Sequence, residues 1–231
     1  MKRFLVLLSV LIVSVFLNLQ ILNAEGAELR VGGGLQLNLA LTVDSTYLGY
    51  YYTSGAGSWG LGVQAGLTAA VPVTGLYRFA GGWGIGGTVE LGYIFLGGPR
   101  LYSSITNNYV ADNYYINHAF MLTANFTSSS PVQGNGWSVL SEIGVVVMPT
   151  YYGYYLGSFS SYNYRTYLGL NLFVGDEMKL FDDNLTFAVG YRLQLLGWTD
   201  NYYAYLVSSS SFIMNMGLEF RLSWLKEFSK N

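Results

Sequence analysis

The stretch LRVGGGLQLNLALTVD, residues 29–44, determines how the rest of the chain is interpreted. Its odd positions are aliphatic apart from one glycine, and its even positions are polar or small. This period of two is typical of a β-strand with two unlike faces, because successive side chains point to opposite sides. An aliphatic face of this length requires an extensive apolar surrounding, and a lipid bilayer provides one.

The same alternation recurs in seven further stretches of the chain. They are residues 59–73, 83–95, 116–126, 137–147, 162–174, 185–195 and 212–224. Within two of them, Ser141 and Thr166 interrupt the apolar face. Eight alternating segments predict an all-β, up-and-down antiparallel transmembrane β-barrel. A hairpin hidden in residues 149–161 would raise the number of strands to ten, and the sequence leaves this alternative open.

Charged residues make up only 10% of the chain, whereas about 25% is usual for soluble domains. A soluble barrel presents a charged face to water, but no strand expected here has such a face. The polar face of Gly, Asn, Gln and Thr therefore suits an enclosed lumen. The absence of cysteine excludes disulfides and thiolate metal sites. The formal net charge of −2 does not favour nucleic-acid binding, which usually needs a basic patch.

The chain begins like an exported precursor. Lys2 and Arg3 precede an almost wholly apolar run, residues 4–22, and Ala24 offers a small residue for cleavage. We expect residues 1–24 to be a signal peptide and residues 25–231 to form a single transmembrane barrel. An uncleaved membrane anchor is the alternative, since the apolar run is nearly long enough to span a bilayer.

The segments between the expected strands fall into two groups. Residues 44–58, 97–115, 149–161 and 197–211 are rich in Tyr and Ser, whereas residues 74–82, 127–136 and 175–184 are shorter. Outer-membrane barrels have short periplasmic turns and longer external loops. We therefore expect the Tyr-rich group to face outward, as a surface for an extracellular partner, and both termini to be periplasmic. Aromatic girdles mark the two membrane interfaces, and their expected tryptophans are Trp59, Trp83, Trp137 and Trp224.

If the apolar face of each expected strand contacts lipid, a set of charged residues on the opposite faces points into the lumen. This predicted ion network consists of Arg30, Glu90, Glu142, Arg165, Arg192, Glu219 and Arg221. Ions enclosed in a narrow barrel must pair, because an unpaired buried charge is very costly. We expect Glu90 and Glu142 to face Arg192 and Arg165 at mid-height. The network is either a plug, which we favour because eight strands leave little internal room, or the gate of a narrow passive pore.

Signals for catalysis are few, and we assign no catalytic residue and no cofactor. His118 is the sole histidine, and it falls on the apolar face of its strand near the expected external end. Ala119 and Phe120 follow it, so no serine lies two residues away. We interpret His118 as a polar residue at the headgroup level and keep a lipid-modifying enzyme as the third candidate function. One histidine without cysteine does not predict a metal site.

The last expected strand carries a polar residue, a glycine two positions on, and then apolar residues: Asn215, Gly217, Phe220 and Leu222. In this segment and in its architecture, the chain resembles the small eight-stranded outer-membrane barrels of the OmpA, OmpX and OmpW type. The resemblance implies that these four residues signal to the barrel-assembly machinery, and that the protein resides among the lipids of the bacterial outer membrane. Members of such a family have several roles, among which the fold does not choose. We expect a structural or surface-interaction role.

Overall fold

A computed structural model describes residues 26–48, 57–79, 81–104, 109–132, 136–156, 159–180, 184–202 and 207–229. The expected signal peptide, residues 1–24, lies outside this described part. Within the described part, no helix has the length and apolar character needed to cross a membrane.

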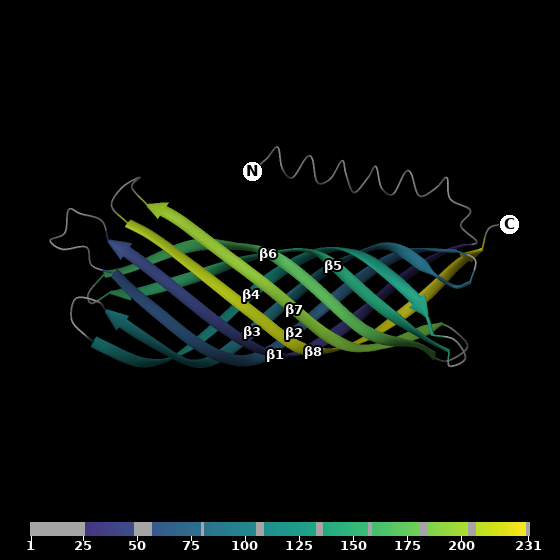
Figure 1. The fold of residues 1–231 in the computed structure, drawn as a ribbon, viewed down its shortest axis with the longest axis horizontal. Coiled ribbons are helices and arrows are strands. Elements are labelled where there is room, and N and C mark those ends of the chain that lie inside the picture. The colour runs from purple at the N-terminus through teal and green to yellow at the C-terminus, as the bar shows by residue number, and fades with distance from the viewer. Residues whose placement is uncertain are drawn as a thin grey trace.

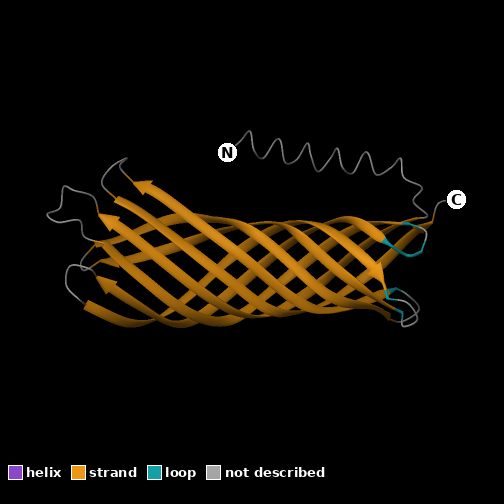
Figure 2. Cartoon of the chain, in the orientation of Figure 1, coloured by secondary structure: helices purple, strands orange, loops and turns teal. Residues whose placement is uncertain are grey.

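Eight antiparallel strands make up almost all of the described chain (Figure 2). They are β1 (Gly26–Leu48), β2 (Gly57–Arg78), β3 (Gly84–Ser104), β4 (Tyr109–Pro131), β5 (Trp137–Leu156), β6 (Phe159–Leu180), β7 (Leu185–Tyr202) and β8 (Val207–Ser229). Each strand pairs with the next, and β8 pairs with β1, which closes the sheet into a barrel. The expected up-and-down barrel is confirmed. The ten-strand alternative is wrong, because β5 and β6 pair with each other directly up to Leu156 and Phe159.

Closure of the barrel depends on the register between its first and last strands. Gly26 pairs with Ser229 and Leu48 pairs with Val207, so the seam runs along the whole of β1. We call the end where β1 begins and β8 ends the terminal end, and the opposite end the distal end. The strands are strongly tilted against the long axis of the barrel (Figure 1). Closure removes the unpaired strand edges that a bilayer cannot solvate.

The two faces of the strands differ as the alternation predicts. On β1, Leu35, Leu37 and Leu39 are exposed, whereas Gln36 and Asn38 between them are buried. Each of the eight strands contributes exposed large apolar or aromatic side chains to an outer band. The buried face carries most of the charged and amide side chains. The described barrel is therefore apolar outside and largely polar inside, the reverse of a soluble barrel.

The strands are longer than the sequence pattern suggested. They contain 18–23 residues, whereas about 9–11 suffice to cross the hydrocarbon. The Tyr-rich segments, expected as long loops, are therefore largely strand: β5 runs to Leu156 and β6 starts at Phe159. The expectation failed because Tyr has a high strand propensity, so antiparallel pairing continues beyond the apolar band. The loop-length contrast between the two ends is smaller than expected.

The terminal-end connections contain glycines with a backbone conformation that other residues rarely adopt. Gly81 and Gly82 follow β2, and Gly136 precedes β5, with φ angles of +83°, +82° and +65°. Glycine tolerates this left-handed region because it has no Cβ. These positions therefore allow the chain to reverse within a few residues.

Of the expected girdle tryptophans, two lie at or just before the start of a strand, one lies near the start of β2 and one lies within β8. Trp83, just before β3, and Trp224 of β8 are exposed, and Trp137, the first residue of β5, is half-buried. Trp59 belongs to β2, but its side chain lies outside the described part. The girdle interpretation stays a prediction.

Candidate functional site in the lumen

Five charged side chains form an ion-paired cluster inside the barrel, which we call the central network. It consists of Glu90 of β3, Glu142 of β5, Arg192 of β7, and Glu219 and Arg221 of β8. All five are buried. Alternation turns each side chain inward, and closure of the sheet brings together positions that are far apart in the sequence.

Each arginine of the central network contacts all three glutamates. Arg192 binds Glu90 through Nη1–Oε1 at 2.5 Å and Nη2–Oε2 at 2.8 Å, and its Nε lies 2.6 Å from Glu219 Oε2. Arg221 binds Glu142 through Nη1–Oε1 at 2.6 Å and Nη2–Oε2 at 2.9 Å, and its Nε lies 2.6 Å from Glu219 Oε1. Longer contacts of 3.7 Å join Arg192 to Glu142 and of 3.5 Å join Arg221 to Glu90. Such paired contacts are the strongest geometry available to a guanidinium and a carboxylate.

Phe173 of β6 fills the space beside the two guanidinium groups. Its side chain is buried, and the Cζ atoms of Arg221 and Arg192 lie 4.3 Å and 5.9 Å from its ring centroid. A cation over an aromatic face is attracted by the ring quadrupole. Phe173 therefore packs against the central network and excludes water from it.

A second ionic cluster, the basal quartet, lies nearer the terminal end and consists of Glu28, Arg30, Arg78 and Glu177. Arg78 binds Glu28 through Nε–Oε1 at 2.8 Å and Nη2–Oε2 at 2.9 Å. Arg30 donates to Glu28 at 2.9 Å and also to Glu177. Sequence reasoning placed Arg30 in the lumen but missed the other three. They lie just beyond the expected strands, and continuing the inward alternation by a few residues would have found them.

The pairing expected for Glu142 is wrong. The structure places Glu90 against Arg192, but Glu142 binds Arg221 instead of Arg165. Arg165 lies on β6, eight residues from Phe173, which pairs with Glu142. Eight residues correspond to roughly 26 Å along a strand, and the side chain of Arg165 lies outside the described part. Alternation gives the face on which a residue lies, but not its height in the barrel.

Uncharged polar side chains form an amide layer on the distal side of the central network. Asn38 Nδ2 donates to Thr68 Oγ1 at 2.7 Å, and Asn215 Nδ2 donates to Gln194 Oε1 at 2.9 Å. Among described residues, Gln36 Nε2, Gln194 Nε2 and Asn215 Oδ1 are buried without a hydrogen-bond partner. Buried amide groups of this kind are the usual environment of ordered internal water.

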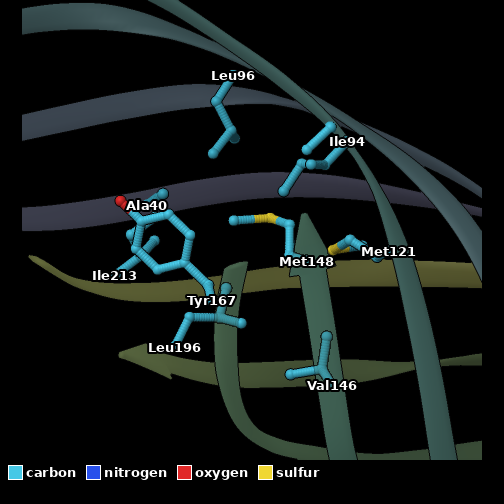
Figure 3. Packing of buried hydrophobic residues seen from close by; sticks show 10 residues of the cluster. Ala40, Ile94, Leu96, Met121, Val146, Met148, Tyr167, Leu196 and Ile213 are labelled. Atoms are coloured by element: carbon cyan, nitrogen blue, oxygen red, sulfur yellow. The ribbon is translucent and has the colours of Figure 1, made fainter. Parts of the chain in front are cut away.

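An apolar layer fills the distal part of the described lumen, and sequence reasoning missed it. Its buried members are Ala40, Ile94, Leu96, Ala119, Met121, Val146, Met148, Tyr167, Leu196 and Ile213. Figure 3 shows these side chains gathered from several strands. They occupy inward positions of the alternation, where we expected polar residues. The signal was a run such as residues 93–96, in which both faces of the strand are apolar.

The terminal end of the barrel opens into a cavity of about 700 Å³. Phe79, Trp137 and Phe228 line it together with Glu28 and Arg78. Glu177 lines it too, so three members of the basal quartet border this cavity.

The remaining candidate for chemistry, His118 of β4, faces away from the lumen. Its side chain is exposed, and its Nδ1 lies 2.9 Å from the hydroxyl oxygen of Tyr93 on β3. Within the described residues, no group of three or more His, Asp or Glu side chains is placed to hold a metal ion. The described charges of the lumen are instead arranged as ion pairs.

The four residues of the expected assembly signal have different surroundings on β8. Asn215 points into the amide layer, whereas Phe220 and Leu222 lie on the outer face. Gly217 lies at a tight approach of β8 to β1: an added Cβ would lie 2.1 Å from the carbonyl oxygen of Leu37. Gly217 is therefore required by packing at the seam, a reason independent of recognition by any machinery.

Comparison with solved structures finds several outer-membrane proteins similar to this chain. The outer membrane protein OprG from Pseudomonas aeruginosa is 14% identical, with 90% of this chain and 98% of that chain covered and a TM-score of 0.49. The outer membrane protease OmpT from Escherichia coli is 6% identical, with 88% and 98% covered and a TM-score of 0.47. The attachment invasion locus protein Ail of Yersinia pestis is 12% identical, with 85% and 99% covered and a TM-score of 0.32. No protein-family model and no curated protein matches the sequence.

The fold and surface of the described chain define its class. It is a closed antiparallel barrel with an apolar outer band and an ion-paired interior. Only helices and closed barrels satisfy their backbone groups within a bilayer, and an apolar exterior of this kind is found in barrels of the outer-membrane type. The protein is therefore a transmembrane β-barrel.

Proposed function

We propose that this protein is an integral barrel of the bacterial outer membrane with a closed lumen and a structural or surface-interaction role, not an enzymatic one. The observation that carries the proposal is the filling of the lumen in successive layers. From the terminal end these are the basal quartet, the central network, the amide layer and the apolar layer. An eight-stranded barrel is just wide enough for side chains to fill its interior.

Two of these layers oppose passage by different physical means. A solute that entered the central network would have to separate buried ion pairs, which leaves uncompensated charges in a medium of low dielectric. The apolar layer opposes water and ions because a hydrophobic constriction dewets. Both layers would have to rearrange before the barrel conducts, which favours the plug over the narrow passive pore.

The same proposal assigns an orientation and partners. The first and last strands share the terminal end, and we place this end in the periplasm, where barrels of this class have short turns. The Tyr-rich strand ends then extend outward as the surface for an extracellular partner, since aromatic side chains are favoured at protein interfaces. The β8 segment around Gly217 is the proposed contact with the barrel-assembly machinery. The apolar band contacts outer-membrane lipid.

Single-channel recording in planar bilayers tests the closed lumen. We expect no stable open steps from the wild-type barrel, and none from Arg192→Gln, because the apolar layer still closes the distal part. Combining Arg192→Gln with Met148→Ala and Leu196→Ala removes parts of both layers and is expected to produce open steps. Leu91→Ala, on the lipid face, is the matched control and should stay silent.

Stable wild-type conductance that changes with Glu90→Gln or Arg192→Gln would contradict the plug. The central network would then be the gate of a narrow passive pore. If the triple variant also shows no conductance, a part of the chain other than these two layers closes the lumen.

A further inference from the structure

Tyr93 and His118 form a polar pair on the lipid-facing surface of the barrel. Phe95 pairs with His118 and Tyr93 pairs with Phe120 in the register of β3 and β4, so all four side chains share the outer face. The Tyr93 hydroxyl lies 2.9 Å from His118 Nδ1. Phe120 packs against the Tyr93 ring edge-to-face, with 5.1 Å between the ring centroids. The orientation of the Tyr93 ring is therefore fixed from one side by Phe120 and from the other by His118.

This contact is compatible with a definite arrangement of the imidazole proton. A tyrosine hydroxyl can donate to Nδ1 of a neutral imidazole, and the other nitrogen, Nε2, then carries the hydrogen. The His118 side chain is exposed, and none of the described residues forms a hydrogen bond with its Nε2. With the Tyr93 hydroxyl as donor, the pair offers one oriented N–H donor, on Nε2, to the surroundings of the barrel.

The position of the Tyr93–His118 pair along the membrane normal determines which part of the lipid surrounds it. His118, Phe120, Leu122, Ala124 and Phe126 follow one another on the outer face of β4. From Phe126 to His118 the strand rises by roughly 20 Å, at about 3.4 Å per residue and a tilt of about 40°. The apolar band of such barrels is about 25 Å tall. Phe126 is exposed and lies toward the terminal end of β4. His118 is therefore most of one band height away from it, near the distal boundary, where lipid headgroups begin.

We propose that His118, oriented by Tyr93, binds the phosphate of a lipid headgroup at the distal boundary of the membrane. An N–H donor to an anionic phosphate oxygen makes a charge-assisted hydrogen bond, which is stronger than one to a neutral acceptor. The exposed lysines Lys179 and Lys226 lie near the terminal end, so they do not bind a phosphate at the level of His118. The inference rests on the proposed membrane location but not on whether the lumen is closed.

Native mass spectrometry of the barrel in dodecyl maltoside micelles tests the site. The probes are phosphatidic acid, diacylglycerol with the same acyl chains, and inorganic phosphate. We expect preferential binding of phosphatidic acid, reduced about three- to tenfold by His118→Leu, the size expected for one exposed charge-assisted hydrogen bond. Diacylglycerol binding should not change. Tyr191→Phe removes the hydroxyl of another exposed tyrosine, 75% accessible on β7, and is the matched control without effect.

The role of Tyr93 is positioning, and it has its own measurement. His118 is the sole histidine, so its ¹⁵N resonances need no assignment among others. The wild-type protein should show the tautomer with hydrogen on Nε2, and Tyr93→Phe should show a mixture of tautomers together with weaker binding of phosphatidic acid.

Three results would overturn the inference. They are equal binding of phosphatidic acid to wild type and His118→Leu, equal binding of phosphatidic acid and diacylglycerol to wild type, and competition by inorganic phosphate at the same concentration as the lipid. The last would indicate an anion site that does not recognise lipid. Failure of the barrel to enter micelles as a folded species, seen by altered migration of unheated protein in gels, would instead contradict the proposed membrane location.

Discussion

Arg192 and Arg221 each contact the same three glutamates. Because the partners are shared, the effect of removing one residue on the stability of the barrel extends to the others. Removing one arginine leaves carboxylates buried with half of their partners, in a place that water does not reach. The lost stability then includes the cost of keeping incompletely paired charges in the low-dielectric interior, in addition to the lost contact itself. The pair of Lys179 and Glu227, 2.6 Å apart but 35% and 55% exposed, lacks this property because water solvates both partners.

Replacing Arg192 by Met should therefore lower the free energy of unfolding by about 3–5 kcal/mol. Glu90 loses its paired contact and Glu219 loses one of its two arginines. Urea-induced unfolding of the barrel in lipid vesicles measures the change. Lys179→Gln is the control, with an expected change below about 1 kcal/mol. Similar changes in the two variants would show that the central network does not stabilise the barrel as described.

A second test at the residue scale concerns Gly217. An alanine Cβ would lie 2.1 Å from the Leu37 carbonyl oxygen, so the seam between β1 and β8 must shift. We expect Gly217→Ala to cost about 1–3 kcal/mol, as overpacking does. Gly33 lies on the other strand of the seam, β1, but has nothing within 4 Å of an added Cβ, and Gly33→Ala should be neutral or slightly stabilising. Unfolding midpoints in urea compare the two, and a neutral Gly217→Ala would argue against a tight seam.

The strands are the elements that the sequence predicted best, and their limits are what it predicted worst. All eight were located because each needs only a local signal, the alternation of apolar and polar residues. Their distal ends were misjudged because these segments mix Tyr, which favours strands, with Ser and Asn, which favour turns, and only pairing with a neighbouring strand decides between the two. At the terminal end, Glu28, Arg78 and Glu177 of the basal quartet were missed because they lie beyond the expected ends of their strands.

At the scale of the strand, depth in the bilayer should control the cost of a charge on the outer face. Leu91 of β3 pairs with Leu122, midway between His118 and Phe126, and is 57% exposed. Leu91→Arg is expected to cost about 2–4 kcal/mol, and Val132→Arg, just past the terminal end of β4, about 0–1 kcal/mol. Folding titrations in vesicles report both values. Equal costs would mean that the exposed face of β3 does not lie in hydrocarbon.

For the molecule as a whole, the sequence predicted which residues share the lumen but not how they are layered there. Glu90 and Arg192 were expected to meet, whereas Arg165 was placed at the wrong height because the relative register of β5 and β6 is not a local property. The apolar layer was missed because the alternation turns residues such as Met148 and Leu196 inward, where polar residues were expected. Only the closed barrel shows that these side chains meet inside.

The most direct test of the account is a scan of water and lipid accessibility along β1. Single cysteines with nitroxide labels at positions 35 to 39 would be examined by electron paramagnetic resonance in vesicles, with oxygen as the apolar and a nickel chelate as the polar relaxation agent. Labels at Leu35, Leu37 and Leu39 are predicted to meet oxygen, and labels at Gln36 and Asn38 to be shielded from lipid. The opposite phase, or no alternation at all, would contradict the assignment of the apolar face to the membrane.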